Sequence, residues 1–300
     1  MDVVIPYRST PEDFELRYAL RSLPNVPHDR VIVAGDKPVI ISKAVQHVPV
    51  GRVEDRYQSS TANIVAAIHG AGVQGEFIVM HDDIFVLRPW SFRHEHLCTI
   101  DEYLKGGQAT GRYRAYVEST QDILRSKGIA EPLWFGLHTP TVYDALRLAD
   151  LVDGFAGHRY LLRTLYYNLF PAPSERRRDV KTRVWRAPPA GADVLSVSDD
   201  CARTAGFRAW ATAQFPDKCR YEIGTDGRCL ILGYGPSLWD DVERALDGGD
   251  FAAVIASPEA AEHWPGEVLA IAYDDDHADR IARSCGFEDT TWCGRTKEAA

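Results

Sequence analysis

The sequence lacks any apolar run that approaches the ~18 residues of a membrane-spanning helix. Residues 1–8 also lack the basic start and long apolar stretch of a signal peptide, so we expect them to form the first strand of the fold. No CxxC spacing occurs among the cysteines at positions 98, 201, 219, 229, 285 and 293. Scattered cysteines indicate reduced thiols and no zinc cluster. These absences together predict a cytoplasmic protein without a membrane span.

Basic residues are also fewer than acidic ones. The chain carries 34 Lys and Arg against 43 Asp and Glu, which gives a formal net charge of −9 at pH 7. That balance weighs against a general nucleic-acid binder, although a local basic groove stays compatible with it. Internal repeats and low-complexity tracts are absent, and a hydrophobic content of 45% is typical of a globular protein. A length of 300 residues fits one large domain, or one domain with a small appendage.

What the chain does contain is a pair of carboxylates between two apolar runs. Phe77 to Met80 is typical of a buried strand, His81-Asp82-Asp83 follows, and Ile84 to Leu87 is apolar again. Carboxylates at the end of a buried strand are costly unless a cation compensates them, either Arg or Lys or a metal. Mg²⁺ is often held by one or two carboxylates plus substrate phosphates. We therefore predict that Asp82 and Asp83 bind Mn²⁺ or Mg²⁺; the alternative is an Asp pair that only caps a turn.

Apolar segments alternate with helical patterns in the first hundred residues. The expected strands are 2–6, 30–35, 45–50 and 77–80, and the expected helices are 11–22 and 60–69. This alternation predicts an α/β fold with a mixed, mostly parallel sheet flanked by helices. Ligands bind beyond the carboxyl ends of the strands in such sheets. Tyr7-Arg8, Gly35-Asp36 and Asp82-Asp83 should therefore share one edge of the sheet.

The remainder of the chain gives weaker signals. From it we expect a hairpin or loop at 106–116, helices at 139–150 and 158–170, a mobile loop or hairpin at 171–191, strands at 229–232, 251–256 and 268–273, and a helix at 277–285. We predict a core over residues 1–225 and a small C-terminal α/β subdomain over 226–300. Gly233-Tyr-Gly235 is an incomplete phosphate-binding turn. A structural subdomain or a dimer surface is favoured there over a second nucleotide site.

Four more clusters carry side chains suited to phosphate chemistry. Arg17 and Arg21 are four residues apart on one helical face and can reach one ligand together. His138 is expected at the start of a helix, Arg163 lies on another, and Asp199-Asp200 ends a second apolar strand. Each has an ordinary structural explanation: a hydrogen-bonded histidine, a solvated helix face, or a helix cap. Their combination predicts charge neutralisation of a pyrophosphate together with a general base.

These clusters, taken in order, resemble the Stealth family, the sugar-1-phosphate transferases of microbial capsule synthesis and lysosomal-enzyme tagging. The segments that carry the resemblance are 2–7, 15–23, 31–36, 60–64, 77–83, 138–140, 199–200 and 215–222. The core of that family is similar to the GT-A glycosyltransferase fold. His81 stands where Asn is common, and the opening is reduced to Ile-Pro-Tyr-Arg-Ser, which ordinary GT-A enzymes also show. Residues 229–300 lie outside the resemblance.

The resemblance implies a role for each cluster. Asp82 and Asp83 would hold the metal and the donor pyrophosphate. His138 would be a base or a phosphate contact, and Arg163 a phosphate clamp. The Asp199-Asp200 pair would bind metal or activate the acceptor. The residues predicted to bind the donor are Tyr7, Arg8, Arg17, Arg21, Asp36 and Asn63.

The sequence therefore predicts a metal-dependent transferase that uses a nucleotide-sugar donor. An acceptor hydroxyl would attack either the sugar C1, releasing a nucleoside diphosphate, or the β-phosphate, releasing a monophosphate. The acceptor is a glycan, a protein or a hydroxylated DNA base, the last suggested by the basic run Arg176–Arg186 with Trp185 as a stacking residue. That run could equally be a solvated loop balanced by Glu175 and Asp179. A non-catalytic nucleotide- or sugar-binding module is the alternative from another class.

Overall fold

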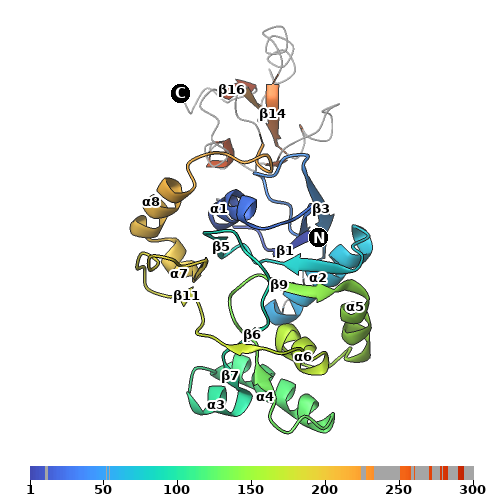
Figure 1. The fold of residues 1–300 in the computed structure, drawn as a ribbon. Helices are drawn as coiled ribbons and strands as arrows, with labels where there is room; N and C mark the ends of the chain where they lie inside the picture. Colours follow the sequence, from blue (N-terminus) through green and yellow to red (C-terminus); the bar gives the residue numbers. More distant parts are fainter. Residues whose placement is uncertain are drawn as a thin grey trace. The chain divides into compact units, whose positions relative to one another are not determined.

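The computed structural model divides into two compact units, which are described separately (Figure 1). The residues that it describes are 1–10, 13–51, 53, 55–223, 228–232, 251–257, 260, 270–271, 278, 280–282 and 290–293. The first unit comprises Met1–Arg8, Tyr18–Asp36 and Val45–Asp217. The second comprises Ser9–Arg17, Lys37–Ala44 and Lys218–Ala300. No helix among the described residues is long and apolar enough to span a bilayer.

A five-stranded sheet organises the first unit. Its strands, in spatial order, are β3 (Val45–Pro49), β2 (Val31–Gly35), β1 (Val3–Tyr7), β4 (Glu76–Val79) and β9 (Thr141–Asp144). The first four strands are parallel, and β9 is antiparallel to β4. The predicted mixed, mostly parallel sheet flanked by helices is confirmed.

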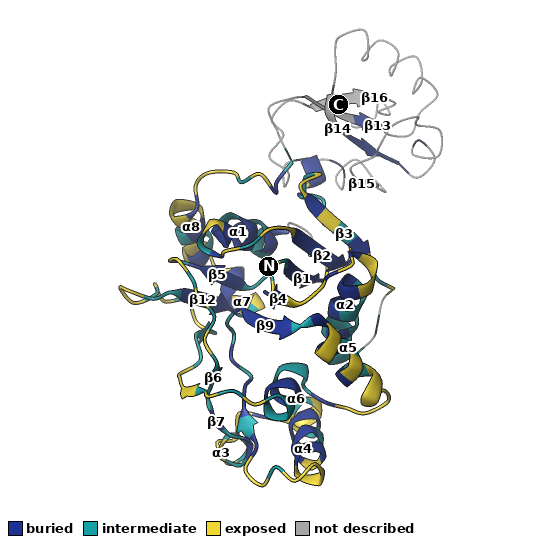
Figure 2. Cartoon of the chain, turned by 45° about the vertical axis from the view of Figure 1, so that its right-hand side comes forward, coloured by how far each residue is buried: buried dark blue, intermediate teal, exposed yellow. Residues whose placement is uncertain are grey.

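Apolar side chains on both faces of the sheet explain why helices cover it. Val4 and Ile32 belong to a core cluster with Ile64 and Ala67 of helix α2 (Arg56–Gly70). Strand residues point alternately to opposite faces. Val33, one position on from Ile32, is also fully buried, as expected of a parallel sheet covered on both sides. Figure 2 shows the buried strands of this sheet and the exposed outer face of α5 (Ala145–Gly154).

The helices and short strands around the sheet complete the first unit. The helices are α1 (Phe14–Ser22, which crosses into the second unit), the 3₁₀ turn η1 (Leu23–Asn25), α3 (Ile100–Lys105), α4 (Gly111–Ser126), α6 (Leu162–Leu169), α7 (Asp199–Ala202) and α8 (Ala205–Gln214). The short strands are β5 (Ile84–Val86), β6 (Glu95–His96), β7 (Cys98–Thr99), β8 (Leu133–Trp134), β10 (Glu175–Arg176), β11 (Lys181–Thr182) and β12 (Val194–Val197). Strands β11, β12 and β5 form a small sheet, in which β5 and β12 are antiparallel.

Two sequence predictions in the middle of the chain are wrong. The hairpin or loop expected at 106–116 is instead a turn followed by the start of α4, a helix of 16 residues. The helix expected at 139–150 is interrupted, because residues 141–144 form strand β9 before α5 begins at Ala145. His138 consequently precedes a strand and not a helix. The helix expected at 158–170 is present in a shorter form, as α6.

The second unit contains a parallel sheet in the order β15-β14-β13-β16. Its strands are β13 (Arg228–Leu232), β14 (Phe251–Ala256), β15 (Ala270–Ile271) and β16 (Thr290–Cys293). Gly233, Tyr234 and Gly235 lie outside the described residues, as does most of the expected helix at 277–285. Two early segments, Ser9–Arg17 and Lys37–Ala44, also belong to this unit, and no sequence signal indicates that. The predicted boundary after residue 225 stays a prediction.

Candidate active site

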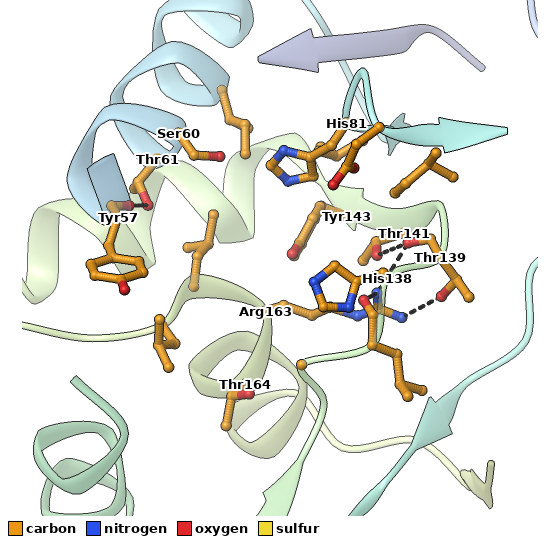
Figure 3. Close-up of a pocket in the computed structure, with 18 of the residues that line it drawn as sticks. Tyr57, Ser60, Thr61, His81, His138, Thr139, Thr141, Tyr143, Arg163 and Thr164 are labelled. Carbon is orange, nitrogen blue, oxygen red and sulfur yellow. Dashed lines mark hydrogen bonds between the residues drawn. The ribbon is translucent and has the colours of Figure 1, made fainter. Parts of the chain in front are cut away.

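A cavity of about 480 Å³ lies at the carboxyl end of β4 (Figure 3). Residues of the first turns of α2, the loop after β4, the segment before β9 and the start of α6 line it, and all of them belong to the first unit. Between β1 and β4 the strand order reverses, because β2 follows β1 on one side and β4 pairs with it on the other. Ligands of open α/β sheets bind at this kind of switch point. The cavity is therefore the best candidate for a ligand site in the described part of the chain.

A histidine in the cavity wall is held by a carboxylate from a distant segment. Nδ1 of His138 lies 2.8 Å from Oδ2 of Asp179, and the backbone N–H of His138 donates to Oδ1 of the same residue at 2.9 Å. A carboxylate can only accept, so Nδ1 carries the proton of this hydrogen bond. When the imidazole is neutral, its other ring nitrogen, Nε2, has its lone pair available. A histidine held this way is suited to act as a general base.

The environment of Asp179 keeps it ionised. Burial works to raise the pKa of this carboxyl, but the hydrogen bond and charge of His138, together with backbone N–H donors from His138 and Val180, outweigh it and lower the pKa below its usual value. The side chain of Asp179 is 27% exposed and that of His138 is 42% exposed. The carboxylate is thus shielded while the imidazole stays open to the cavity.

The predicted metal residues lie where the sequence placed them, directly after β4. Asp83 lines the cavity, and its Oδ2 accepts a hydrogen bond from Nζ of Lys181 in a salt bridge. Asp82 is half-buried and is not among the residues that line the cavity. No group of three or more His, Cys, Asp or Glu side chains suited to a metal occurs within the described residues. The assignment of Mn²⁺ or Mg²⁺ to Asp82 and Asp83 stays a prediction.

His81 adds a second imidazole to the cavity. Its ring is exposed to the cavity, yet protein surrounds it closely enough for desolvation to lower its pKa. Asp83 acts in the opposite direction, and the positive charges of Lys181 and Arg163 lower the pKa further. His81 is therefore neutral at pH 7, with a pKa below the usual value for histidine.

Arg163 places a positive charge in the cavity without a carboxylate beside it. Its guanidinium donates to the carbonyl oxygens of Leu137 at 2.5 Å and Thr139 at 3.0 Å, and to Oγ1 of Thr139 at 3.0 Å. Its Nε is buried and has no hydrogen-bond partner. No described carboxylate lies within salt-bridge distance of it, and desolvation lowers its pKa. A half-buried cation satisfied only by neutral acceptors is a favourable place for an anion.

Aromatic rings form one wall of the cavity. Tyr57, Tyr113 and Trp134 all line it, and the rings of Tyr57 and Tyr113 are stacked with centroids 5.6 Å apart. Gly136 makes the close approach of Trp134 possible, because a Cβ at Gly136 would come within 2.4 Å of the indole ring. Ring faces of this kind suit a flat base or the apolar face of a sugar.

The predicted donor-binding residues at the ends of β1 and β2 do share one edge of the sheet. Tyr7 pairs with Gly35, and the carbonyl oxygen of Tyr7 accepts from the backbone N–H of Asp36 at 3.3 Å. The same oxygen accepts from Nδ2 of Asn63, also at 3.3 Å, so the amide of Asn63 serves a buried structural contact. Arg8 and Asp36 are exposed. None of these residues lines the cavity, and their role in donor binding stays a prediction.

The two arginines of α1 each contact protein groups. Arg17 forms a salt bridge of 3.3 Å with Oε1 of Glu222 within the second unit. Arg21, in the first unit, donates to the carbonyl oxygens of Phe215 at 3.0 Å and Pro216 at 3.2 Å. Arg21 thereby satisfies backbone acceptors that follow the last turn of α8. These contacts give both residues a structural role, and binding of one ligand by the pair stays a prediction.

Asp199 and Asp200 occupy the first turn of α7. Ser198 caps this helix by accepting from the backbone N–H of Cys201, and Asp200 forms an exposed salt bridge of 3.1 Å with Arg203. Both carboxylates are exposed and neither lines the cavity. Their strand nevertheless ends beside the first pair, because the backbone N–H of Val197 donates to the carbonyl oxygen of Asp83 at 3.2 Å.

Some cations of the basic run pair with acidic residues that the sequence did not indicate. Arg176 pairs with Glu102 at 3.4 Å, and Arg177 pairs with Glu95. The interpretation as a solvated loop assumed that Asp179 balances the charge of these arginines. Asp179 instead holds His138.

Trp185 is packed within the fold. Its ring lies against Phe207 and Trp210 of α8, with both centroid distances at 5.3 Å. Gly206 leaves room for the ring, since a Cβ there would meet it at 2.7 Å. These contacts give Trp185 a structural role, and its interpretation as a stacking residue for a nucleic-acid base stays a prediction.

Comparison with known proteins adds little to this site. No protein-family model matches the sequence, and no curated protein matches it. Two similar solved structures are both of the glycosyltransferase GlyE from Streptococcus pneumoniae TIGR4, each 10% identical to this chain. The apo form aligns over 100% of this chain and 93% of GlyE with a TM-score of 0.34, and the other structure over 98% and 80% with a TM-score of 0.35. Scores of this size do not establish a shared fold, so the function is inferred from the site itself.

Proposed function

We propose that the protein is a glycosyltransferase of GT-A-like architecture that uses a nucleotide-sugar donor. One observation carries this proposal: the His138–Asp179 pair and the carboxylate-free guanidinium of Arg163 line or adjoin a single cavity at the switch point of the sheet. A base and an anion-binding cation side by side are what transfer from a diphosphate leaving group requires. The aromatic wall supports a ligand with a flat base or a sugar ring.

The proposed step is a substitution at the sugar C1. Nε2 of His138 takes the proton of an acceptor hydroxyl while the hydroxyl oxygen forms a bond to C1. The bond between C1 and the diphosphate oxygen breaks, and its electron pair leaves with the nucleoside diphosphate. Arg163 stabilises the charge that develops on that diphosphate. Asp179 holds the imidazole in the required tautomer and stabilises the imidazolium that forms.

Transfer of sugar-1-phosphate is the second candidate, supported by the Stealth resemblance of the clusters that include Asp83, His138 and Arg163. In that reaction the acceptor oxygen attacks the β-phosphorus, and the bond from that phosphorus to the oxygen bridging it to the α-phosphate breaks. Nucleoside monophosphate then leaves with the electron pair. The same base and the same cation serve both reactions, so the released nucleotide distinguishes them.

The deciding experiment is incubation with a panel of nucleotide sugars and with glycan, protein and hydroxylated-DNA acceptors. Release of nucleoside diphosphate supports glycosyl transfer, and release of monophosphate supports sugar-phosphate transfer. His138→Gln is the matched variant, because it should bind donor normally and fail to turn it over. A protein that binds nucleotide sugars but never releases a nucleotide would favour the non-catalytic binding module.

A DNA acceptor receives little support from the charges on the protein. Arg176 and Arg177 already engage Glu102 and Glu95, and Trp185 is packed against α8. Contacts to DNA phosphates contribute most to binding at low salt. A wild-type protein that fails to shift duplex or single-stranded DNA under that condition would therefore exclude DNA as the acceptor.

A further inference from the structure

The cation beside Asp83 is part of the protein. Lys181 lies on β11, which pairs with β12 so that Lys181 stands opposite Ser196. Strand β12 in turn pairs with β5, where Ser196 stands opposite Ile84, the residue after Asp83. Backbone pairing across three strands therefore places the lysine next to the carboxylate. The two side chains are only 15% and 23% exposed, so solvent screens their attraction less than it does at a surface.

The contact with Lys181 compensates the negative charge of Asp83 at the end of its strand. A divalent ion at Asp83 would have to displace the ammonium group or share one carboxylate with it, and two cations at that separation repel each other. Without any cation, Asp83 would itself repel the diphosphate of a donor. Lys181 removes that repulsion. Its ammonium has three N–H donors, and Asp83 is the one acceptor that the described residues give it.

We propose that Lys181 takes the place of a divalent metal at Asp83 and, together with Arg163, binds the diphosphate of the donor. This inference rests on the proposed function and names the source of its positive charge. Lys181 does not itself line the cavity, whereas its partner Asp83 does, and two N–H donors of Lys181 are left for phosphate oxygens beside Asp83 once that carboxylate has taken one. As the bond from C1 to the diphosphate breaks, the electron pair passes to the leaving oxygen. Lys181 and Arg163 neutralise that charge without transferring a proton.

The test is nucleotide binding with and without metal. Binding of UDP, GDP, ADP, CDP and dTDP to the full-length protein is measured by calorimetry in EDTA and again in Mn²⁺. We expect the wild type to bind one of these diphosphates in EDTA, with an affinity that Mn²⁺ changes by less than about threefold. Lys181→Met should weaken that binding in EDTA by about 10- to 100-fold, the size expected for losing one charged hydrogen-bond donor.

Metal should then rescue the variant. In Lys181→Met the carboxylate of Asp83 is unpaired, so Mn²⁺ can bridge it to the diphosphate and restore most of the lost affinity. Lys181→Arg should retain metal-independent binding, because it keeps the charge. Lys105→Met, which removes an exposed lysine from α3, controls for the change in net charge and should behave like the wild type.

The outcomes separate this inference from the proposed function. Wild-type binding that requires Mn²⁺ and disappears in EDTA would overturn the role of Lys181 and leave the glycosyltransferase proposal intact. Failure of all five nucleotides to bind in either condition would remove the proposed function, and this inference with it. The wild-type measurement decides both points even if Lys181→Met does not fold.

Discussion

Asp179 accepts a hydrogen bond of 2.8 Å from Nδ1 of His138 across 41 residues of sequence. A second bond, from the backbone N–H of His138 to the other carboxylate oxygen, holds the two residues in register. The pair couples the segment that precedes β9 to the basic run that contains β11. Because the bond fixes the tautomer of the imidazole, Asp179 is a positioning residue for the proposed base.

Both members of this pair should be needed for turnover. His138→Gln should lower kcat by about 10²- to 10⁴-fold, the usual contribution of a general base. Asp179→Asn should also lower kcat, because an amide can donate to Nδ1 and so favour the tautomer that carries its proton on Nε2, which leaves no base at that nitrogen. Donor affinity, measured by calorimetry, should change little in either variant. Weakened donor binding with normal kcat would instead make His138 a binding residue.

The ionisation of Asp179 predicts how stability depends on pH. Burial raises the pKa of this carboxyl, but its hydrogen bonds to His138 outweigh burial. The folded-state pKa therefore lies below its usual value of 3.8. The ionised carboxylate therefore stabilises the fold at pH values above its usual pKa, and this stabilisation is lost as the pH falls through the folded-state pKa. Asp179→Ala should lower the free energy of unfolding by about 1–3 kcal/mol at pH 7, and by less at pH 3.

Urea unfolding at both pH values measures this difference. Asp200→Ala is the control, because its carboxylate is 92% exposed and its pair with Arg203 should contribute little. A penalty for Asp179→Ala that grows as the pH falls would contradict the assigned direction.

Gly136 should be intolerant of a side chain. Gly136→Ala would place a Cβ 2.4 Å from the ring of Trp134, and overpacking of this kind costs typically about 1–3 kcal/mol. Gly154→Ala in α5 is the matched control, since nothing lies within 4 Å of its Cβ position. Calorimetric melting should show a lower Tm for Gly136→Ala and an unchanged or higher Tm for Gly154→Ala. Equal melting temperatures would show that the indole ring can move aside.

Neighbouring arginines of the basic run should differ in their effect on stability. Arg177 pairs with Glu95, whose side chain is only 7% exposed, so Arg177→Ala leaves a buried carboxylate unpaired. We expect a loss of about 1–3 kcal/mol in the free energy of unfolding. Arg178 is exposed, and Arg178→Ala should stay within about 0.5 kcal/mol of the wild type. Denaturant titration checks both, and a stable Arg177→Ala variant would mean that Glu95 finds another partner.

We expect the exposed carboxylates of α7 to act on the acceptor. Asp199→Asn and Asp200→Asn leave the cavity unchanged, because neither residue lines it. We expect donor affinity to be unaltered and the KM for acceptor to rise severalfold, since β12 ends beside Asp83. Steady-state kinetics with donor and acceptor varied separately provide the measurement. A loss of donor affinity would assign these carboxylates to the donor side.

Buried strands were the most predictable part of the fold. The runs that became β1, β2 and β4 are continuously apolar, and the shared edge of Tyr7, Gly35 and Asp83 follows from parallel pairing. Helix α4 was missed because the glycines at 106, 107 and 111 signal a turn, whereas its buried face, from Tyr116 to Leu124, comes later. Strand β9 was missed because it is four residues long and runs directly into α5.

Some residues of the site were predictable from local sequence clusters, and others depend on contacts between segments distant in the sequence. Asp83, His138 and Arg163 were predicted because each belongs to a recognisable local cluster, and the structure brings all three to one cavity. Asp179 and Lys181 were not, because their importance depends on partners 41 and 98 residues away. Composition assigned them to a charged loop, and only the tertiary contacts reveal what they hold.

Within residues 177–181, the three side chains at alternate positions contact different partners. Arg177 contacts Glu95, Asp179 contacts His138, and Lys181 contacts Asp83. In extended chain, side chains two apart point the same way and immediate neighbours point the opposite way. Deleting Val180 would therefore turn Lys181 away from Asp83 while Asp179 stayed in place, and an inserted residue would do the same. The spacing of this segment is consequently more constrained than the identity of the exposed residue Arg178, and insertions or deletions within the segment should abolish function where a substitution at Arg178 is tolerated.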